Sequence, residues 1–64
     1  MKIDTEQVIE TYKDRIFVIG LTMLKNPDDA EDIVQETFLR YHTYKKDFES
    51  KEHIESWLYK VAIN

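Results

Sequence analysis

The sequence predicts an all-α fold: a compact three-helix domain with two long antiparallel helices, a loop and a third, crossing helix. Three observations predict it. Apolar residues recur at helical spacing in three separate segments. Only one glycine and one proline are present to interrupt helices. Charged residues make up 34% of the chain, as in amphipathic helices with one solvated face. The length allows one small domain, residues 1–64.

The first helix is predicted to run from about Asp4 to Lys25. Asp4 or Thr5 can cap it, because both side chains accept hydrogen bonds from free backbone N–H groups. The apolar residues at helical spacing are Val8, Ile9, Tyr12, Ile16, Ile19 and Met23. Phe17, Val18, Leu21 and Leu24 widen this arc. We therefore expect burial on more than one side, with Gly20 allowing close approach of another helix.

A break follows at residues 26–27, because proline disfavours helical geometry at the residue before it. Asp28 is predicted to cap the second helix, and Glu31, three residues later, would complete a capping box. The second helix then runs from residue 29 to about residue 44 or 45.

Residues 46–52 show no apolar periodicity, and Phe48 is their only apolar residue. They are predicted to form a loop pinned by Phe48. The third helix begins near residue 52 or 53, with an apolar stripe of Ile54, Trp57, Leu58 and Val61. It reaches Asn64 without a glycine stop or a basic last turn, which suggests a fragment of a longer protein.

The composition argues against several classes of function. Without cysteine there is no disulfide or thiolate metal site, and His42 and His53 are too far apart for a zinc motif. No catalytic triad or glycine-rich phosphate loop is present, so we expect neither an enzyme nor a cofactor. No apolar run approaches the ~20 residues of a membrane span, and no signal peptide is evident. We expect a cytoplasmic protein without a membrane partner.

The net charge of −4 comes from one segment. Residues 26–41 carry five carboxylates against Arg40, whereas residues 1–25 and 42–64 each carry four positive and four negative side chains. This segment therefore predicts a basic partner approached with electrostatic steering. The overall negative charge argues against strong binding of duplex DNA.

The second helix has two distinct faces at 100° per residue. Its apolar face carries Ala30, Val34, Phe38 and Tyr41. The opposite face, which we call the acidic stripe, carries Asp32, Gln35, Glu36 and Leu39. A leucine ringed by polar groups resembles a small protein-binding epitope. An ordinary solvated helix face is the alternative interpretation.

The third helix places His53, Trp57, Lys60 and Asn64 within a narrow arc. This arc offers an aromatic ring for stacking, a cation for phosphate and an amide for a base edge. The alternative is that Trp57 belongs to the core and that the other side chains form the solvated edge beside it.

Aromatic and basic residues also alternate in and around the predicted loop: Tyr41, Tyr44, Lys45, Lys46, Phe48 and Lys51. This combination suits single-stranded nucleic acid. The alternative is that the aromatic rings pack beneath the loop and that the aliphatic parts of the lysine side chains cover them.

Taken in order, these residues resemble region two of the sigma-70 family of bacterial transcription initiation factors. The small extracytoplasmic-function group is closest in form. Two motifs carry the resemblance, Asp-Ala-Glu-Asp-Ile-Val-Gln-Glu-Thr-Phe-Leu at residues 29–39 and Ser-Trp-Leu-Tyr-Lys-Val-Ala-Ile-Asn at residues 56–64.

The resemblance implies that the acidic helix docks on the clamp helices of the beta-prime subunit, the largest subunit of RNA polymerase. By position, Asp32, Gln35 and Glu36 would make the polar contacts and Leu39 an apolar one. An inhibitory anti-sigma factor is a further partner that the family implies.

The resemblance also implies that the domain recognises and melts the minus-ten promoter element. A base of the non-template strand would flip into a pocket formed by a loop at about residues 45–52 and closed by Asn64. The residues expected to contact DNA are Lys45, Lys46, Phe48, Lys51, His53, Lys60 and Asn64. Ile63 stands where many relatives carry arginine, so one backbone contact is expected to be missing. A protein-interaction module without DNA reading is the rival function.

Overall fold

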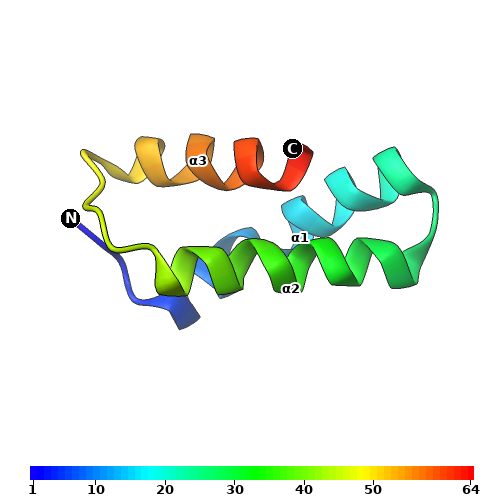
Figure 1. Cartoon of the computed structure of the whole chain (residues 1–64), viewed down its shortest axis with the longest axis horizontal. Helices are drawn as coiled ribbons and strands as arrows, with labels where there is room; N and C mark the ends of the chain where they lie inside the picture. Colours follow the sequence, from blue (N-terminus) through cyan, green and yellow to red (C-terminus); the bar gives the residue numbers. More distant parts are fainter.

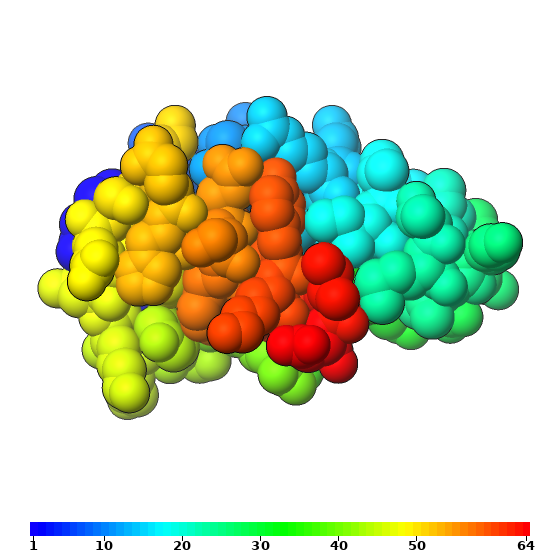
Figure 2. All heavy atoms as spheres, turned by 90° about the horizontal axis from the view of Figure 1, so that it is seen from above, coloured from blue at the N-terminus to red at the C-terminus, as the bar shows by residue number.

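The computed structural model describes residues 1–64 and contains three helices: α1 (Thr5–Leu24), α2 (Pro27–Thr43) and α3 (Lys51–Ile63). α1 and α2 form an antiparallel hairpin, and α3 lies over both of them (Figures 1 and 2). The tip of the hairpin extends beyond the C-terminal end of α3. The predicted all-α, three-helix fold is confirmed.

No helix in the structure is both long enough and apolar enough to cross a membrane.

The core lies where the three helices meet. Its nine buried residues come from every helix and from the loop before α3: Val8, Tyr12, Ile16, Phe38, Tyr41, Phe48, Ile54, Leu58 and Ala62. Phe48 is 2% exposed, so the predicted pinning of the loop is confirmed. The loop is therefore part of the folded unit, because its one apolar side chain is a core residue.

α1 is less buried than predicted. Its buried residues, Val8, Tyr12, Ile16 and Gly20, form a single narrow stripe. Val18 is 58% exposed, and Leu24 near the hairpin tip is also exposed. Burial on more than one side is therefore only partly confirmed: Phe17 and Leu21 are half-buried, whereas Val18 and Leu24 are exposed. The hairpin tip, where Leu24 lies, extends beyond α3 (Figure 2). Val18 instead borders Tyr59 of α3, on the side of α1 away from its buried stripe.

Gly20 of α1 packs closely against Ala30 of α2. A Cβ atom added there would stand 3.1 Å from Ala30 Cα and 3.3 Å from Ala30 Cβ. The predicted close approach is confirmed, and it depends on small residues on both helices.

α2 begins two residues earlier than predicted, and its N-cap is Asn26 rather than Asp28. The Asn26 side-chain oxygen accepts hydrogen bonds from the backbone N–H groups of Asp28 and Asp29, at 2.8 and 3.2 Å. Asn26 is extended (φ −144°, ψ 121°), the conformation that a residue before proline prefers. Pro27 then occupies the first helical position, where its missing N–H costs nothing.

We expect Asn26→Ala to lower the free energy of unfolding by about 1 kcal/mol, because two N–H groups lose their acceptor. For a domain of this size, that corresponds to about 4–8 °C in the melting midpoint. Asp28→Glu keeps the charge while changing the side chain, so it should stay within about 0.5 kcal/mol of the wild type. Thermal melts followed by circular dichroism compare the two. A larger loss of unfolding free energy for Asp28→Glu than for Asn26→Ala would show that Asp28, and not Asn26, caps α2.

α3 also begins slightly earlier than predicted. Ser50 is its N-cap, and the Ser50 hydroxyl oxygen accepts from the His53 backbone N–H at 3.1 Å. The connection between α2 and α3 is therefore residues 44–50, which we call the loop. It lies at the end of the molecule that also holds the N-terminus (Figure 1).

Candidate functional site

The acidic stripe faces solvent along its whole length. Asp32, Gln35, Glu36 and Leu39 are all exposed, Leu39 by 59%. Asp32 and Gln35 make no side-chain hydrogen bond, whereas Glu36 accepts from Arg40 Nε at 3.1 Å within the same helix. The stripe therefore offers two unengaged polar side chains, one carboxylate already shared with a cation, and one aliphatic side chain.

Two hollows flank the stripe and add apolar surface to it. A hollow of about 520 Å³ lies between α2, the end of α1 and the end of α3, with Met23, Leu24, Ile33 and Ile63 among its apolar lining. A second of about 380 Å³ lies towards the start of α1, and Leu39 contributes to it. This face therefore combines carboxylates with neighbouring apolar surface, as protein-binding surfaces do.

A five-ring aromatic cluster holds the loop against α2 and α3. Its members are Tyr41, Tyr44, Phe48, His53 and Trp57. The Phe48 ring centroid lies 5.6 Å from Tyr41, 5.2 Å from Tyr44 and 5.6 Å from Trp57. The Tyr44 and Trp57 rings lie 4.8 Å apart, and both residues are half-buried. Part of this cluster is therefore open to solvent beside the loop.

Phe48 and His53 are packed within the fold, which limits the contacts that their side chains can make with a ligand. Phe48 is buried, so its expected direct contact with DNA is not available in this conformation. The half-buried His53 accepts a hydrogen bond at Nδ1 from the Glu49 backbone N–H, at 2.9 Å. Both residues shape the loop from beneath, while Tyr44 and Trp57 present ring surface in their place. The interleaving of aromatic and basic residues had indicated Tyr44 from the sequence.

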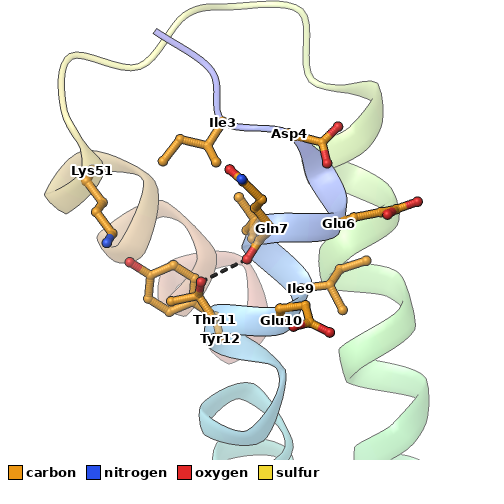
Figure 3. A pocket seen from close by; sticks show the side chains of 10 residues that line it. Ile3, Asp4, Glu6, Gln7, Ile9, Glu10, Thr11, Tyr12 and Lys51 are labelled. Carbon is orange, nitrogen blue, oxygen red and sulfur yellow. Dashed lines mark hydrogen bonds between the residues drawn. The ribbon is translucent and has the colours of Figure 1, made fainter.

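The predicted DNA-contacting lysines do not all lie together. Lys45 and Lys46 are exposed on the loop beside the aromatic cluster, and Lys60 is exposed on the same arc of α3 as His53 and Trp57. Lys51 instead lines a hollow between α3 and the start of α1, where it points towards Tyr12 (Figure 3). At 100° per residue, Lys51 is on the opposite side of α3 from His53. Lys51 therefore does not share a surface with the other lysines.

Asn64 is also separated from the loop. It follows α3, a helix of 13 residues whose first turn adjoins the loop. At 1.5 Å per residue, the two ends of α3 are about 20 Å apart. Asn64 lines the hollow that also contains Asp32 and Glu36. The structure therefore does not bring Asn64 to the loop, and its expected contact with DNA stays a prediction.

The tyrosine hydroxyl beneath the cluster is tied to the N-terminal segment. Tyr41 donates a hydrogen bond to the Ile3 carbonyl at 2.6 Å. Burial raises the pKa of Tyr41 above its ordinary value. Sequence periodicity placed Tyr41 in the core but gave no sign of this partner, which lies 38 residues away along the chain.

Residues 8–64 match the family model Sigma-70 region 2. The chain belongs to the Sigma-70 region 2 family. This sigma region 2 domain is 37% identical over 57 residues to the ECF RNA polymerase sigma factor SigW of Bacillus subtilis (strain 168), covering 89% of the chain and 30% of that protein. It is 33% identical over 55 residues to the RNA polymerase sigma factor SigV of the same organism, covering 86% of the chain and 33% of that protein.

A third relative is more distant. The ECF RNA polymerase sigma factor SigE of Mycolicibacterium smegmatis (strain ATCC 700084 / mc(2)155) is 27% identical over 59 residues, covering 92% of the chain and 23% of that protein. The sigma region 2 domain thus spans about a third or less of the length of these curated relatives. No solved structure is a significant match to it.

Proposed function

We propose that this domain acts in transcription initiation by binding the beta-prime clamp helices through the acidic stripe and the minus-ten promoter element through the loop end of the molecule. The observation that carries the proposal is the separation of two exposed surfaces of different chemistry. The acidic stripe lies on the outer side of α2, whereas Lys45, Lys46 and the open rings of the aromatic cluster lie at the loop. The names of the relatives, RNA polymerase sigma factors, fit this pair of ligands.

The chemistry of the stripe favours a basic helical partner. Asp32 and Gln35 are free to accept hydrogen bonds, and the exposed Leu39 lines the neighbouring hollow together with Gln35. The carboxylates of the acidic stripe would steer a basic surface towards it, and burial of Leu39 on binding would add affinity. Glu36 contributes less, because Arg40 already occupies one of its oxygens.

The loop end favours single-stranded DNA. The half-buried rings of Tyr44 and Trp57 provide stacking surfaces, and Lys45 and Lys46 provide cations for phosphate. Base stacking on an aromatic side chain contributes about 1–3 kcal/mol per base, which offsets the few kcal/mol needed to unstack a base from the duplex. Capture of unpaired bases would thereby favour strand separation.

The strand would continue along α3 from the loop towards its C-terminal end. His53 and Asn64 lie on one arc of α3, and 11 residues at 1.5 Å each place them about 16 Å apart. Lys60 lies between them and is exposed, which suits a phosphate contact. In this arrangement Asn64 reads a base edge further along the strand, not within the loop.

A function limited to protein binding is the second candidate. The net charge of −4 and the carboxylates of Asp47 and Glu49 on the loop weaken attraction to nucleic acid. The hollow beside Ile33 and Ile63 adds apolar surface next to the carboxylates, which would suit an anti-sigma factor as a partner.

Binding of fluorescent minus-ten oligonucleotides distinguishes the two functions. We expect tighter binding of the non-template single strand than of the duplex. Replacing Lys45 and Lys46 together by alanine should weaken this binding and reduce the slope of log affinity against log salt by about 1.4, at 0.7 per phosphate contact.

The matched control replaces Lys13 and Lys25, which carry the same charge on α1 and at the hairpin turn. This variant should retain the salt slope of the wild type. Equal binding of single strand and duplex, or equal losses in both double variants, would favour the function limited to protein binding.

A further inference from the structure

The four residues before α1, which we call the N-terminal strap, lie against the loop. Met1 and Phe48 exchange backbone hydrogen bonds: the Met1 nitrogen donates to the Phe48 carbonyl at 2.7 Å, and the Phe48 N–H donates to the Met1 carbonyl at 2.9 Å. Such mutual pairing is the repeating unit of an antiparallel ladder. The strap and the loop therefore hold each other, although they lie 47 residues apart in the chain.

Lys2 joins the strap to the end of α2. Its ammonium group donates to the carbonyl of Tyr44 at 2.7 Å and to that of His42 at 3.2 Å. The same group lies 5.2 Å from the centroid of the Tyr41 ring. The carbonyls at a helix C-terminus lack partners within the helix and carry partial negative charge, so a cation there is stabilising.

The chain leaves α2 at this point without a glycine stop. Tyr44 is the C-cap and adopts an extended conformation (φ −68°, ψ 128°). Its carbonyl marks the direction in which the loop departs, and Lys45 and Lys46 follow directly. The Lys2 ammonium group is hydrogen-bonded to the carbonyls of both Tyr44 and His42, so it restrains the direction in which the loop leaves α2.

We propose that Lys2 is a positioning residue for the loop, acting through the terminal carbonyls of α2. It fixes where Lys45 and Lys46 stand relative to the open rings of Tyr44 and Trp57. The N-terminal strap thus supports the DNA-binding surface without contacting DNA. The inference rests on the proposed role of the loop in DNA binding, but the restraint of the loop can be measured without DNA.

The first measurement is amide hydrogen exchange by NMR in Lys2→Ala. We expect the Phe48 amide to exchange about fivefold faster, as loss of about 1 kcal/mol of local stability implies. Amides in the middle of α1 should exchange at the wild-type rate. Lys2→Arg, which retains a cation and donors, should restore protection. Lys13→Ala makes the same charge change at an exposed lysine of α1 and should leave the Phe48 amide unchanged.

The second measurement is binding of the single-stranded minus-ten oligonucleotide to the same variants. We expect Lys2→Ala to bind about fivefold more weakly than the wild type, and Lys2→Arg and Lys13→Ala to bind within about twofold of it.

Unchanged exchange at Phe48 in Lys2→Ala would overturn the inference. Faster exchange with unchanged oligonucleotide binding would overturn the role of Lys2 in DNA binding. If the wild-type domain binds no oligonucleotide, the proposed DNA function fails, while the exchange data still decide whether Lys2 restrains the loop.

Discussion

Replacing Phe48 by alanine is expected to unfold most of the domain. Its ring contacts four other rings, and it is the only core residue that the loop contributes. Removing a buried phenylalanine costs about 3–5 kcal/mol. A core in a domain below ~70–80 residues rarely supplies more than that in total. We therefore expect a melting midpoint lowered by about 12 °C or more, or no cooperative transition at all.

Thermal and urea denaturation followed by circular dichroism measure this loss. Val18→Ala is the matched control, because it also shortens an apolar side chain but at an exposed position. It should change the free energy of unfolding by less than about 0.5 kcal/mol. A Phe48→Ala midpoint within a few degrees of the wild type would show that the loop does not contribute to the core.

Reversing the charge of Asp32 is expected to have the largest effect on polymerase binding. Asp32→Lys places a cation against the basic partner, and we expect it to weaken binding to the clamp helices by about 1–3 kcal/mol, or about 5–150-fold. Gln35→Ala and Leu39→Ala should also weaken binding. Glu36→Ala should cost less than Asp32→Ala, because Glu36 is already paired with Arg40.

The control for charge is Glu52→Lys, which makes the same reversal at an exposed, unpaired carboxylate of α3. It should bind the clamp helices within about twofold of the wild type, since it lies outside the proposed interface. Isothermal titration calorimetry, with circular dichroism to verify folding, compares these variants. Equal losses for Asp32→Lys and Glu52→Lys would mean that only net charge matters, and the acidic stripe would lose its specific role.

Helical periodicity predicted the fold because each helix buries one apolar face. The spacing of Val8, Tyr12 and Ile16 placed the core stripe of α1 correctly. It could not show how wide the buried arc of α1 is, so the exposure of Val18, which borders Tyr59 of α3, was missed. Periodicity reports which side of a helix is apolar, whereas burial depends on where the neighbouring helices lie against it.

The cap of α2 was misassigned because two local rules competed. Asp28 followed by Glu31 fits a capping box, but Pro27 can occupy the first helical position. Its ring also favours the extended conformation that makes Asn26 a cap. Proline at the start of the helix decided the outcome.

The candidate site was only partly predictable for a different reason. The acidic stripe depends on one helix, so its exposed face followed directly from residue spacing. The position of Asn64 relative to the loop depends on the full length of α3. The pairing of Met1 with Phe48 and of Lys2 with Tyr44 joins segments more than 40 residues apart, and no sequence pattern marks either contact.

Titration of the wild-type domain with the isolated clamp helices of the beta-prime subunit tests the central proposal most directly. The proposed docking of the acidic stripe predicts micromolar binding that weakens as salt rises from about 50 to 200 mM, because screening shortens the reach of its carboxylates. Absence of binding, or binding that is insensitive to salt, would contradict an acidic docking surface on α2.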